Sequence, residues 1–360
     1  MTRSRFSSAS GFTLVELLIV LAIIGLLISL AVPAIQASRE VARRAKCTNN
    51  QRQYGVAFIN FESRNKAFPS SLTLRLKGPL VTDPGWETHN FMVDLLPFLE
   101  ENTVNNIYHR DAMYCAPENA AAVETRLDVA ICPSAPRTEL TPTTHLVPSL
   151  TVSSSARKNF KVVFDKLDAK YSMSFRGGVS DYAVAFQVED GLASELGFTL
   201  PKEGGDGLPG MFPSPLHQSE KVLLSKVLPI LNGPGTADLS IQMRAAQITD
   251  GLSHTFMLTE VAGRPDHYRM GVRYPPGEPL ESAWADPYAA FQISGFGDQS
   301  PKCLLQCDNA GEIYSFHPSG VNFLFADGHV ECLDGDTDPR VIVALLTPNQ
   351  GDNHERSNSP

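Results

Sequence analysis

Five acidic or imidazole side chains from position 181 onward could do hydrolytic chemistry or hold a cation: Asp181, Asp250, Glu260, His317 and Asp327. A histidine with carboxylates can act as general acid and base, and Asp oxygens are ligands that Ca²⁺ prefers. No nucleophile elbow, HExxH sequence or phosphate loop accompanies them. The alternative interpretation is structural, because Asp250-Gly251 and Asp327-Gly328 are turn pairs and His317 can hydrogen-bond a loop. We favour the structural interpretation and therefore predict no catalytic residues. Whether a calcium ion binds stays open.

Cysteine is the other residue type with chemical potential. The chain has six: Cys47, Cys115, Cys132, Cys303, Cys307 and Cys332. In an exported chain, disulfides can form, and the candidates are Cys47, Cys132, Cys303, Cys307 and Cys332. Their connectivity does not follow from sequence. Cys303 and Cys307 with Cys332 and His329 could alternatively be drawn as a zinc site, although the usual short-spaced cysteine pairs are absent. The identity of any metal stays open, and no cofactor is expected.

An apolar run near the N-terminus must position everything that follows. From Phe12 to Val32 it carries a single charge, Glu16. As a helix it would reach about 31 Å, which spans the hydrocarbon core of a bilayer. An ordinary signal peptide has a shorter apolar core and a small-residue cleavage site, which this segment lacks. A plain signal anchor would explain the basic leader but not Gly11 or Glu16.

Gly11-Phe12-Thr13-Leu14-Val15-Glu16 resembles the processing motif of type IV prepilins and pseudopilins. The resemblance implies that prepilin peptidase removes a short basic leader between Gly11 and Phe12 on the cytoplasmic face. It also implies N-methylation of Phe12. In the pilin scheme, Glu16 meets the N-terminal ammonium of a neighbouring subunit, which would offset the cost of a carboxylate in hydrocarbon.

After Pro33, which can kink or restart the helix, an amphipathic pattern extends over residues 34–66. Its apolar stripe comprises Ile35, Val41, Ala45, Tyr54, Phe58 and Phe61, and basic and acidic residues occupy the other face. We expect this stripe to pack on the body of the protein.

The rest of the chain predicts a body of strands and loops. Gly 26 and Pro 26 indicate many turns, and a formal net charge of -9 argues against a nucleic-acid partner. Residues 86–101 are predicted as a short helix and residues 129–132 as a short strand. A turn at 248–251 leads into a strand at 254–260, and residues 321–333 form a hairpin around Asp327-Gly328. Residues 137–155 and 202–215 are predicted loops.

The spacing of His317 and Asp327-Gly328, with nine residues between them, resembles the H-X9-DG signature of a large bacterial family. That family, domain of unknown function 1559, couples a prepilin-type N-terminus to an exported domain. Its members resemble the pseudopilins of type II secretion. Blocks in the family's order are 47–50, 68–69, 95–100, 132–134, 180–182, 248–253 and Glu260. Departures are Gln51, His254 and Ser319, which put local packing in question.

Together these observations predict an α+β, pilin-like fold: a long N-terminal helix on an antiparallel sheet with loop insertions. The predicted divisions are a leader at 1–11, a membrane helix at 12–33, its amphipathic continuation at 34–66, an exported domain at 67–347 and a disordered tail at 348–360. The expected location is the cytoplasmic membrane, single-pass, with the body in the periplasm or at the cell surface.

The expected function is that of a non-enzymatic envelope protein with a structural, assembly or secretion-associated role. Expected partners are prepilin peptidase, the inner membrane, and other pilin-like subunits or secretion machinery. The body is larger than that of typical pilins, which favours a minor, capping or display role. The alternatives are an envelope receptor for carbohydrate or protein, and a tethered hydrolase using His317 and Asp327.

Overall fold

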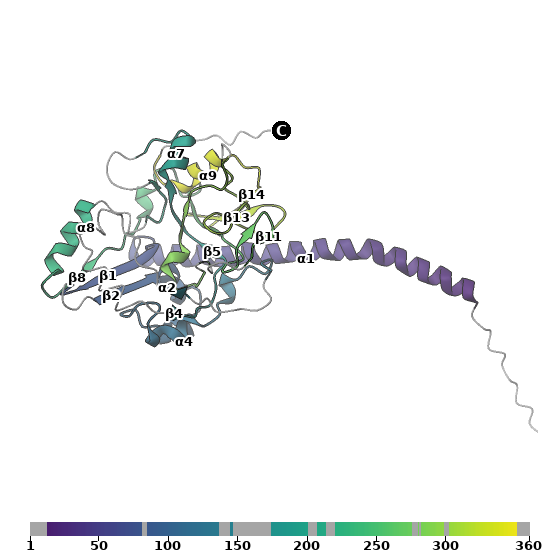
Figure 1. The fold of residues 1–360 in the computed structure, drawn as a ribbon, viewed down its shortest axis with the longest axis horizontal. Helices are drawn as coiled ribbons and strands as arrows, with labels where there is room; N and C mark the ends of the chain where they lie inside the picture. Colours follow the sequence, from purple (N-terminus) through teal and green to yellow (C-terminus); the bar gives the residue numbers. More distant parts are fainter. Residues whose placement is uncertain are drawn as a thin grey trace, which may run out of the picture.

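The structure is a computed structural model that describes residues 13–80, 85–136, 145–146, 174–200, 207–213, 220–275, 280, 282–298 and 302–350. One long helix projects from a body of short strands and helices (Figure 1). The fold is α+β, as predicted. Of the sequence predictions, those for the leader, Gly11 and Phe12, for most of the 137–155 loop and of the tail, and for half of the 202–215 loop lie outside the described residues.

Helix α1 runs from Leu14 to Asn65, 52 residues in all. It begins in a capping box, in which the Glu16 carboxylate accepts from the Thr13 N–H at 2.9 Å and the Thr13 hydroxyl accepts from the Glu16 N–H. It ends at Lys66, whose left-handed backbone (φ 62°) turns the chain. The helix continues through Pro33 rather than restarting there. Good helix formers on both sides of the proline maintain the other hydrogen bonds of the ladder.

The N-terminal part of α1 lies outside the body. Among the described residues, α1 is the one helix long and apolar enough to cross a membrane, and its most apolar 18-residue window has a mean hydropathy of 2.9. None of that window is buried within the protein. A helix that is apolar on all sides and uncovered by protein is typical of a membrane span, because in water its whole apolar surface would be exposed.

The C-terminal part of α1 enters the body. Its buried residues begin at Cys47 and recur at helical spacing: Cys47, Asn50, Gln51, Tyr54, Gly55, Ala57, Phe58 and Phe61. The predicted packing of Tyr54, Phe58 and Phe61 is therefore confirmed. The inclusion of Ile35, Val41 and Ala45 in the same stripe was wrong, because all three are exposed. Ile35 lies before the helix reaches the body, and Val41 and Ala45 lie off the face on which Glu40 and Cys47 contact it.

The central sheet has the strand order β14-β13-β9-β5 and lies against α1. Strands β13 (Val321–Phe325) and β14 (Val330–Leu333) form the predicted hairpin, with Gly328 at φ 91° in its turn. Strand β9 (Phe256–Glu260) pairs antiparallel with β13 and with β5 (Tyr182–Ala183). Gly55 lets α1 approach this sheet, since a Cβ there would stand 3.0 Å from Leu324 and 3.2 Å from the Gly328 backbone.

Two further three-stranded sheets extend the body. One is antiparallel, in the order β2-β1-β8, from β1 (Leu72–Gly78), β2 (Gly85–Asn90) and β8 (Gly235–Asp238). The other, β12-β6-β7, joins β6 (Ala185–Glu189) in parallel to β12 (Phe291–Ile293) and antiparallel to β7 (Gly207–Pro209). Two-residue pairs complete the strands: β3 (His145–Leu146) with β4 (Ser174–Phe175), and β10 (Tyr268–Arg269) with β11 (Val272–Arg273).

Short helices cover the sheets. The α-helices are α2 (Phe91–Leu95), α3 (Asn102–Ile107), α4 (Ala120–Val123), α7 (Asp190–Glu195), α8 (Glu220–Val227) and α9 (Pro339–Leu346). The 3₁₀ helices are η1 (Leu96–Phe98), η2 (Pro117–Asn119), η3 (Asp128–Ala130), η5 (Leu228–Ile230), η6 (Ala245–Gln247) and η7 (Pro287–Ala289). Helices α3, α4, α7, α8 and α9 were not predicted.

Several local predictions were wrong. Within the predicted 137–155 and 202–215 loops, residues 145–146 and 207–209 form strands β3 and β7, because they pair with β4 and β6. Residues 86–90 form strand β2 rather than the start of a helix, because six residues of β2 pair in register with β1. The helix begins only at Phe91, where the Asn90 side chain accepts from the Met92 N–H. Residues 128–130 form η3 rather than a strand.

Candidate functional site

Four chain segments meet at a buried cluster of sulfur, nitrogen and oxygen atoms. Cys47 comes from α1, Cys132 from the loop after η3, Glu260 from the end of β9 and His317 from the loop before β13. Cys47, Glu260 and His317 are fully buried and Cys132 is 1% exposed. We call these residues the four-ligand cluster, because one ligand atom from each lies within 4.8 Å of the others.

The distances in the cluster are short. The Cys47 and Cys132 Sγ atoms lie 2.8 Å apart. His317 Nε2 lies 3.6 Å from Cys132 Sγ and 3.5 Å from Glu260 Oε1. The imidazole nitrogen therefore faces a sulfur and a carboxylate oxygen together.

The other nitrogen of His317 contacts helix α1. Its Nδ1 lies 2.6 Å from Glu40 Oε1. Glu40 also accepts from the Ser134 hydroxyl at 3.0 Å and pairs with Arg43 at 2.7 Å. The Glu40 carboxylate helps to fix the orientation of the imidazole ring, because both ring nitrogens then have defined neighbours.

Hydrogen bonds from the backbone hold the carboxylates in place. The Asp181 carboxylate accepts from the N–H of Cys132 at 2.7 Å and from that of Gly263 at 2.9 Å. Glu260 Oε2 accepts from the Asn322 N–H at 3.1 Å. Glu260 and Cys132 are thereby positioned by the sheet and by a fixed loop.

Polar side chains of α1 fix the helix against the same loops. Asn50 Nδ2 donates to the Ile131 carbonyl at 3.0 Å, and Gln51 Nε2 donates to the Asn322 carbonyl at 2.9 Å. Gln51, noted above as a departure from the family pattern, thus binds strand β13 directly.

Burial and hydrogen bonds together set the electrostatics of the cluster. Burial alone would lower the pKa of His317, but its hydrogen bonds with Cys132 and Glu260 and their charges raise it to about 11. The hydrogen bond with Cys47, together with burial, raises the pKa of the Cys132 thiol well above its ordinary value. Burial also opposes ionisation of Glu40, yet hydrogen bonds from His317, Arg43 and Ser134 outweigh it and lower its pKa.

The sequence-predicted residues separate into two groups. His317, Glu260 and Asp181 share this region, whereas Asp327 lies in the hairpin turn with its Oδ1 2.5 Å from His329 Nδ1. Asp250 accepts from the Gln350 N–H at 2.8 Å, near the end of the described chain. His317 and Asp327 therefore do not form the pair that the hydrolase alternative needs, because each side chain contacts a different partner.

Sequence reasoning missed Glu40 and did not pair Cys47 with Cys132. The two cysteines are separated by 85 positions, and Glu40 and His317 by 277. No spacing rule connects residues at such separations. The one available signal was that each cysteine lies in a block resembling the same family.

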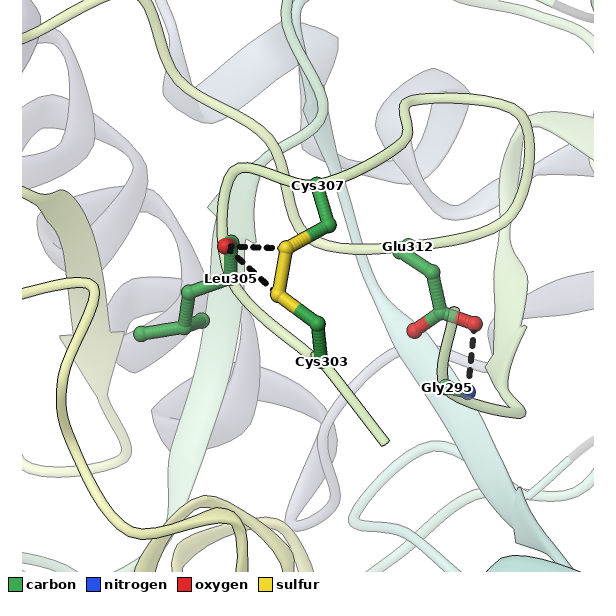
Figure 2. The surroundings of a disulfide bond; sticks show 5 residues. All are labelled: Gly295, Cys303, Leu305, Cys307 and Glu312. Atoms are coloured by element: carbon green, nitrogen blue, oxygen red, sulfur yellow. Dashed lines mark hydrogen bonds between the residues drawn. A yellow bond between two sulfur atoms is a disulfide. The ribbon is translucent and has the colours of Figure 1, made fainter. Parts of the chain in front are cut away.

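The zinc site drawn from Cys303, Cys307, Cys332 and His329 is not formed. Cys303 and Cys307 are joined by a disulfide, with both sulfurs near the Leu305 carbonyl oxygen (Figure 2). Cys332 Sγ lies 3.4 Å from the Ser319 carbonyl oxygen, and His329 lies beside Asp327. A disulfide sulfur has no thiolate to offer a metal.

Glu312 lies near the disulfide and is buried (Figure 2). Its Oε1 accepts from the N–H groups of Ser294 and Gly295, and burial raises its pKa to about 7. The folded chain therefore keeps a proton that the unfolded chain loses, and the free energy of unfolding falls as pH rises from about 4.5 to about 7.

Glu312→Gln is expected to remove that pH-dependent loss, worth about 3 kcal/mol at neutral pH. Urea unfolding of both proteins at pH 5 and pH 8 measures it, and the variant should show the smaller change between the two. Glu118→Gln, at an exposed position, is the matched control and should reproduce the wild-type difference. Equal pH dependence of Glu312→Gln and wild type would contradict the assignment.

The N-terminal part of α1 is apolar and is not covered by the α+β body. Its N-terminus is capped, and its first turn carries a carboxylate. These features define the class of pilin-like, membrane-anchored proteins. Residues 6–32 match the family described as the prokaryotic N-terminal methylation motif. Residues 36–340 match the family described as a protein of unknown function (DUF1559), and the chain belongs to this family. Searches of curated proteins and of solved structures gave no match.

Proposed function

We propose that the protein is cleaved by prepilin peptidase between Gly11 and Phe12, methylated at Phe12 and held in the cytoplasmic membrane by α1, with its body outside. The observation that carries this proposal is the uncovered apolar window of α1, together with the match of residues 6–32 to the methylation motif. A soluble protein would bury such a window, and an ordinary secretory leader would be removed together with it.

The dimensions of α1 support a short stalk. The segment from Leu14 to Val32 spans about 28 Å, close to the thickness of the hydrocarbon core. About 10 Å of helix then separates Pro33 from Glu40, where α1 first contacts the body through His317 and Ser134. The body would stand this far from the bilayer, with the basic cluster of α1 beginning at Arg39 on the side of the lipid headgroups.

We assign the body a structural, assembly or secretion-associated role rather than an enzymatic one. Burial supports this role, because His317 and Glu260 are fully buried and a catalytic pair must reach its substrate. The Glu16 carboxylate, held by Thr13 in the single chain, could exchange this partner for the N-terminus of a neighbouring pilin-like subunit.

Gly11→Val is expected to abolish leader removal, because a branched side chain replaces the smallest residue at the cleavage position. Mass spectrometry of the N-terminal peptide, from protein isolated from membranes of its own cell, measures it. The wild-type peptide should begin at N-methyl-Phe12, and the variant should keep residues 1–11. Ser8→Ala, within the same leader, is the control and should be processed normally. A wild-type N-terminus downstream of α1's apolar window, or a freely soluble mature chain, would refute the proposal.

A further inference from the structure

The four-ligand cluster combines the donor types that zinc proteins use. Two cysteine sulfurs, one imidazole nitrogen and one carboxylate oxygen make a complete set of four, the coordination number of structural zinc sites. Two sulfurs are a poor match to Ca²⁺ or Mg²⁺, which take oxygen ligands. The donor set therefore selects a zinc-like ion.

The spacing around His317 fits a tetrahedron. Zinc–ligand bonds of about 2.0–2.3 Å place a sulfur and a nitrogen ligand about 3.5 Å apart, and a nitrogen and an oxygen ligand about 3.4 Å apart. The corresponding distances from His317 Nε2 are 3.6 Å to Cys132 Sγ and 3.5 Å to Glu260 Oε1. The two sulfurs, 2.8 Å apart, would have to separate by about 1 Å to take tetrahedral positions.

The surroundings of His317 are those of a metal-bound histidine. Such residues present one ring nitrogen to the metal and donate the other N–H to a carboxylate or carbonyl, which fixes the tautomer. Glu40 occupies that second position at 2.6 Å from Nδ1. The Glu260 carboxylate is itself oriented by the Asn322 N–H and side-chain amide. Both ligands are thus held from outside the cluster.

Charge balance points the same way. The fully buried Glu260 carboxylate and two sulfurs lie around one imidazole. The buried Asp181 carboxylate accepts from the Cys132 N–H next to them. Buried negative charge is costly unless a cation compensates it. A divalent cation at the centre of the cluster would supply that compensation.

We propose that Cys47, Cys132, Glu260 and His317 bind one Zn²⁺ ion. The ion joins α1 to three separate segments of the body, at the point where the membrane helix enters it. Its role is structural: it clamps the anchor helix to the exported domain. The proposal does not depend on leader processing, since every ligand lies within the folded body.

The competing structure is a Cys47–Cys132 disulfide, which needs an S–S bond of about 2.05 Å. It would account for the two sulfurs and leave His317 and Glu260 converging on them without a ligand role. The experiment must therefore distinguish the two directly.

Metal analysis of the full-length protein, purified in detergent without chelators or a polyhistidine tag, is the test. About one zinc per chain is expected in the wild type, and less than about a tenth in Cys47→Ser and His317→Ala. Cys332→Ser is the matched control, because Cys332 lies on neighbouring β14 and contributes no atom to the cluster. It should retain the full zinc content.

A second readout does not rely on the variants folding. Wild-type protein reloaded with Co²⁺ should show thiolate-to-cobalt charge-transfer absorption and the visible spectrum of a tetrahedral site. Peptide mapping after alkylation without reduction should find Cys47 and Cys132 unlinked and Cys303 linked to Cys307. A Cys47–Cys132 disulfide in the native protein would overturn the proposal. Two free thiols that bind neither zinc nor cobalt would overturn it too.

Discussion

Phe58→Ala is expected to lower the free energy of unfolding of the body by about 3–5 kcal/mol. Phe58 is fully buried on α1. Its ring centroid lies 5.7 Å from that of Phe91 and 5.5 Å from that of Phe212. Removing the ring loses the free energy of its transfer out of water and leaves a cavity. The helix cannot easily move to close this cavity, because the sheet and the hydrogen bonds from Asn50 and Gln51 hold it in place.

The measurement is chemical denaturation of the full chain in detergent, followed by tryptophan fluorescence from buried Trp86 and Trp284. Val56→Ala, on the exposed face of the same helix, is the control and should change the stability by less than about 0.5 kcal/mol. A loss below about 1 kcal/mol for Phe58→Ala would mean that α1 is not an integral part of the core. The result therefore tests how firmly the anchor is joined to the domain that it carries.

Gly320→Ala is expected to lower the free energy of unfolding by about 3–5 kcal/mol, because it combines backbone strain with a steric clash. Gly320 has φ 117°, and a Cβ there would stand 2.1 Å from the Leu333 carbonyl oxygen. That oxygen belongs to strand β14, so the clash cannot be relieved by rotating a side chain. Gly320 also donates its N–H to the His317 carbonyl, so the turn that delivers His317 to the cluster would be displaced.

Gly191→Ala is the matched control. Gly191 lies in helix α7, and no atom would stand within 4 Å of its Cβ. Alanine is the better helix former, so this variant should be unchanged or more stable by about 0.5–1 kcal/mol. Thermal unfolding of the two variants beside the wild type gives the comparison. If Gly320→Ala retained wild-type stability, the tight turn before β13 would be refuted.

Several elements followed from local sequence because local chemistry determines them. The turn at Asp327-Gly328 needs a residue that tolerates positive φ, and Gly328 has φ 91°. Strand β9 after the 248–251 turn and the stripe of Tyr54, Phe58 and Phe61 follow from periodicity in the same way.

Other elements depended on partners distant in the chain. Residues 86–90 carry apolar and polar side chains that suit either a helix or a strand, and pairing with β1 decides for the strand. Residues 129–132 were predicted as a strand, yet residues 128–130 form η3, and the Ala130 carbonyl accepts a hydrogen bond from the Asp181 N–H. In both places tertiary contacts outweigh local propensity.

The amino-acid sequence alone determined the anchor: a hydrocarbon-length apolar helix with one carboxylate needs no tertiary information, because its solvent is the bilayer. It also indicated that His317, Glu260 and Asp181 were worth attention. Only the tertiary structure decided their partners. It separated Asp327 from His317 and brought Glu40, Cys47 and Cys132 to the imidazole, because ligand geometry depends on how distant segments pack and not on their order along the chain.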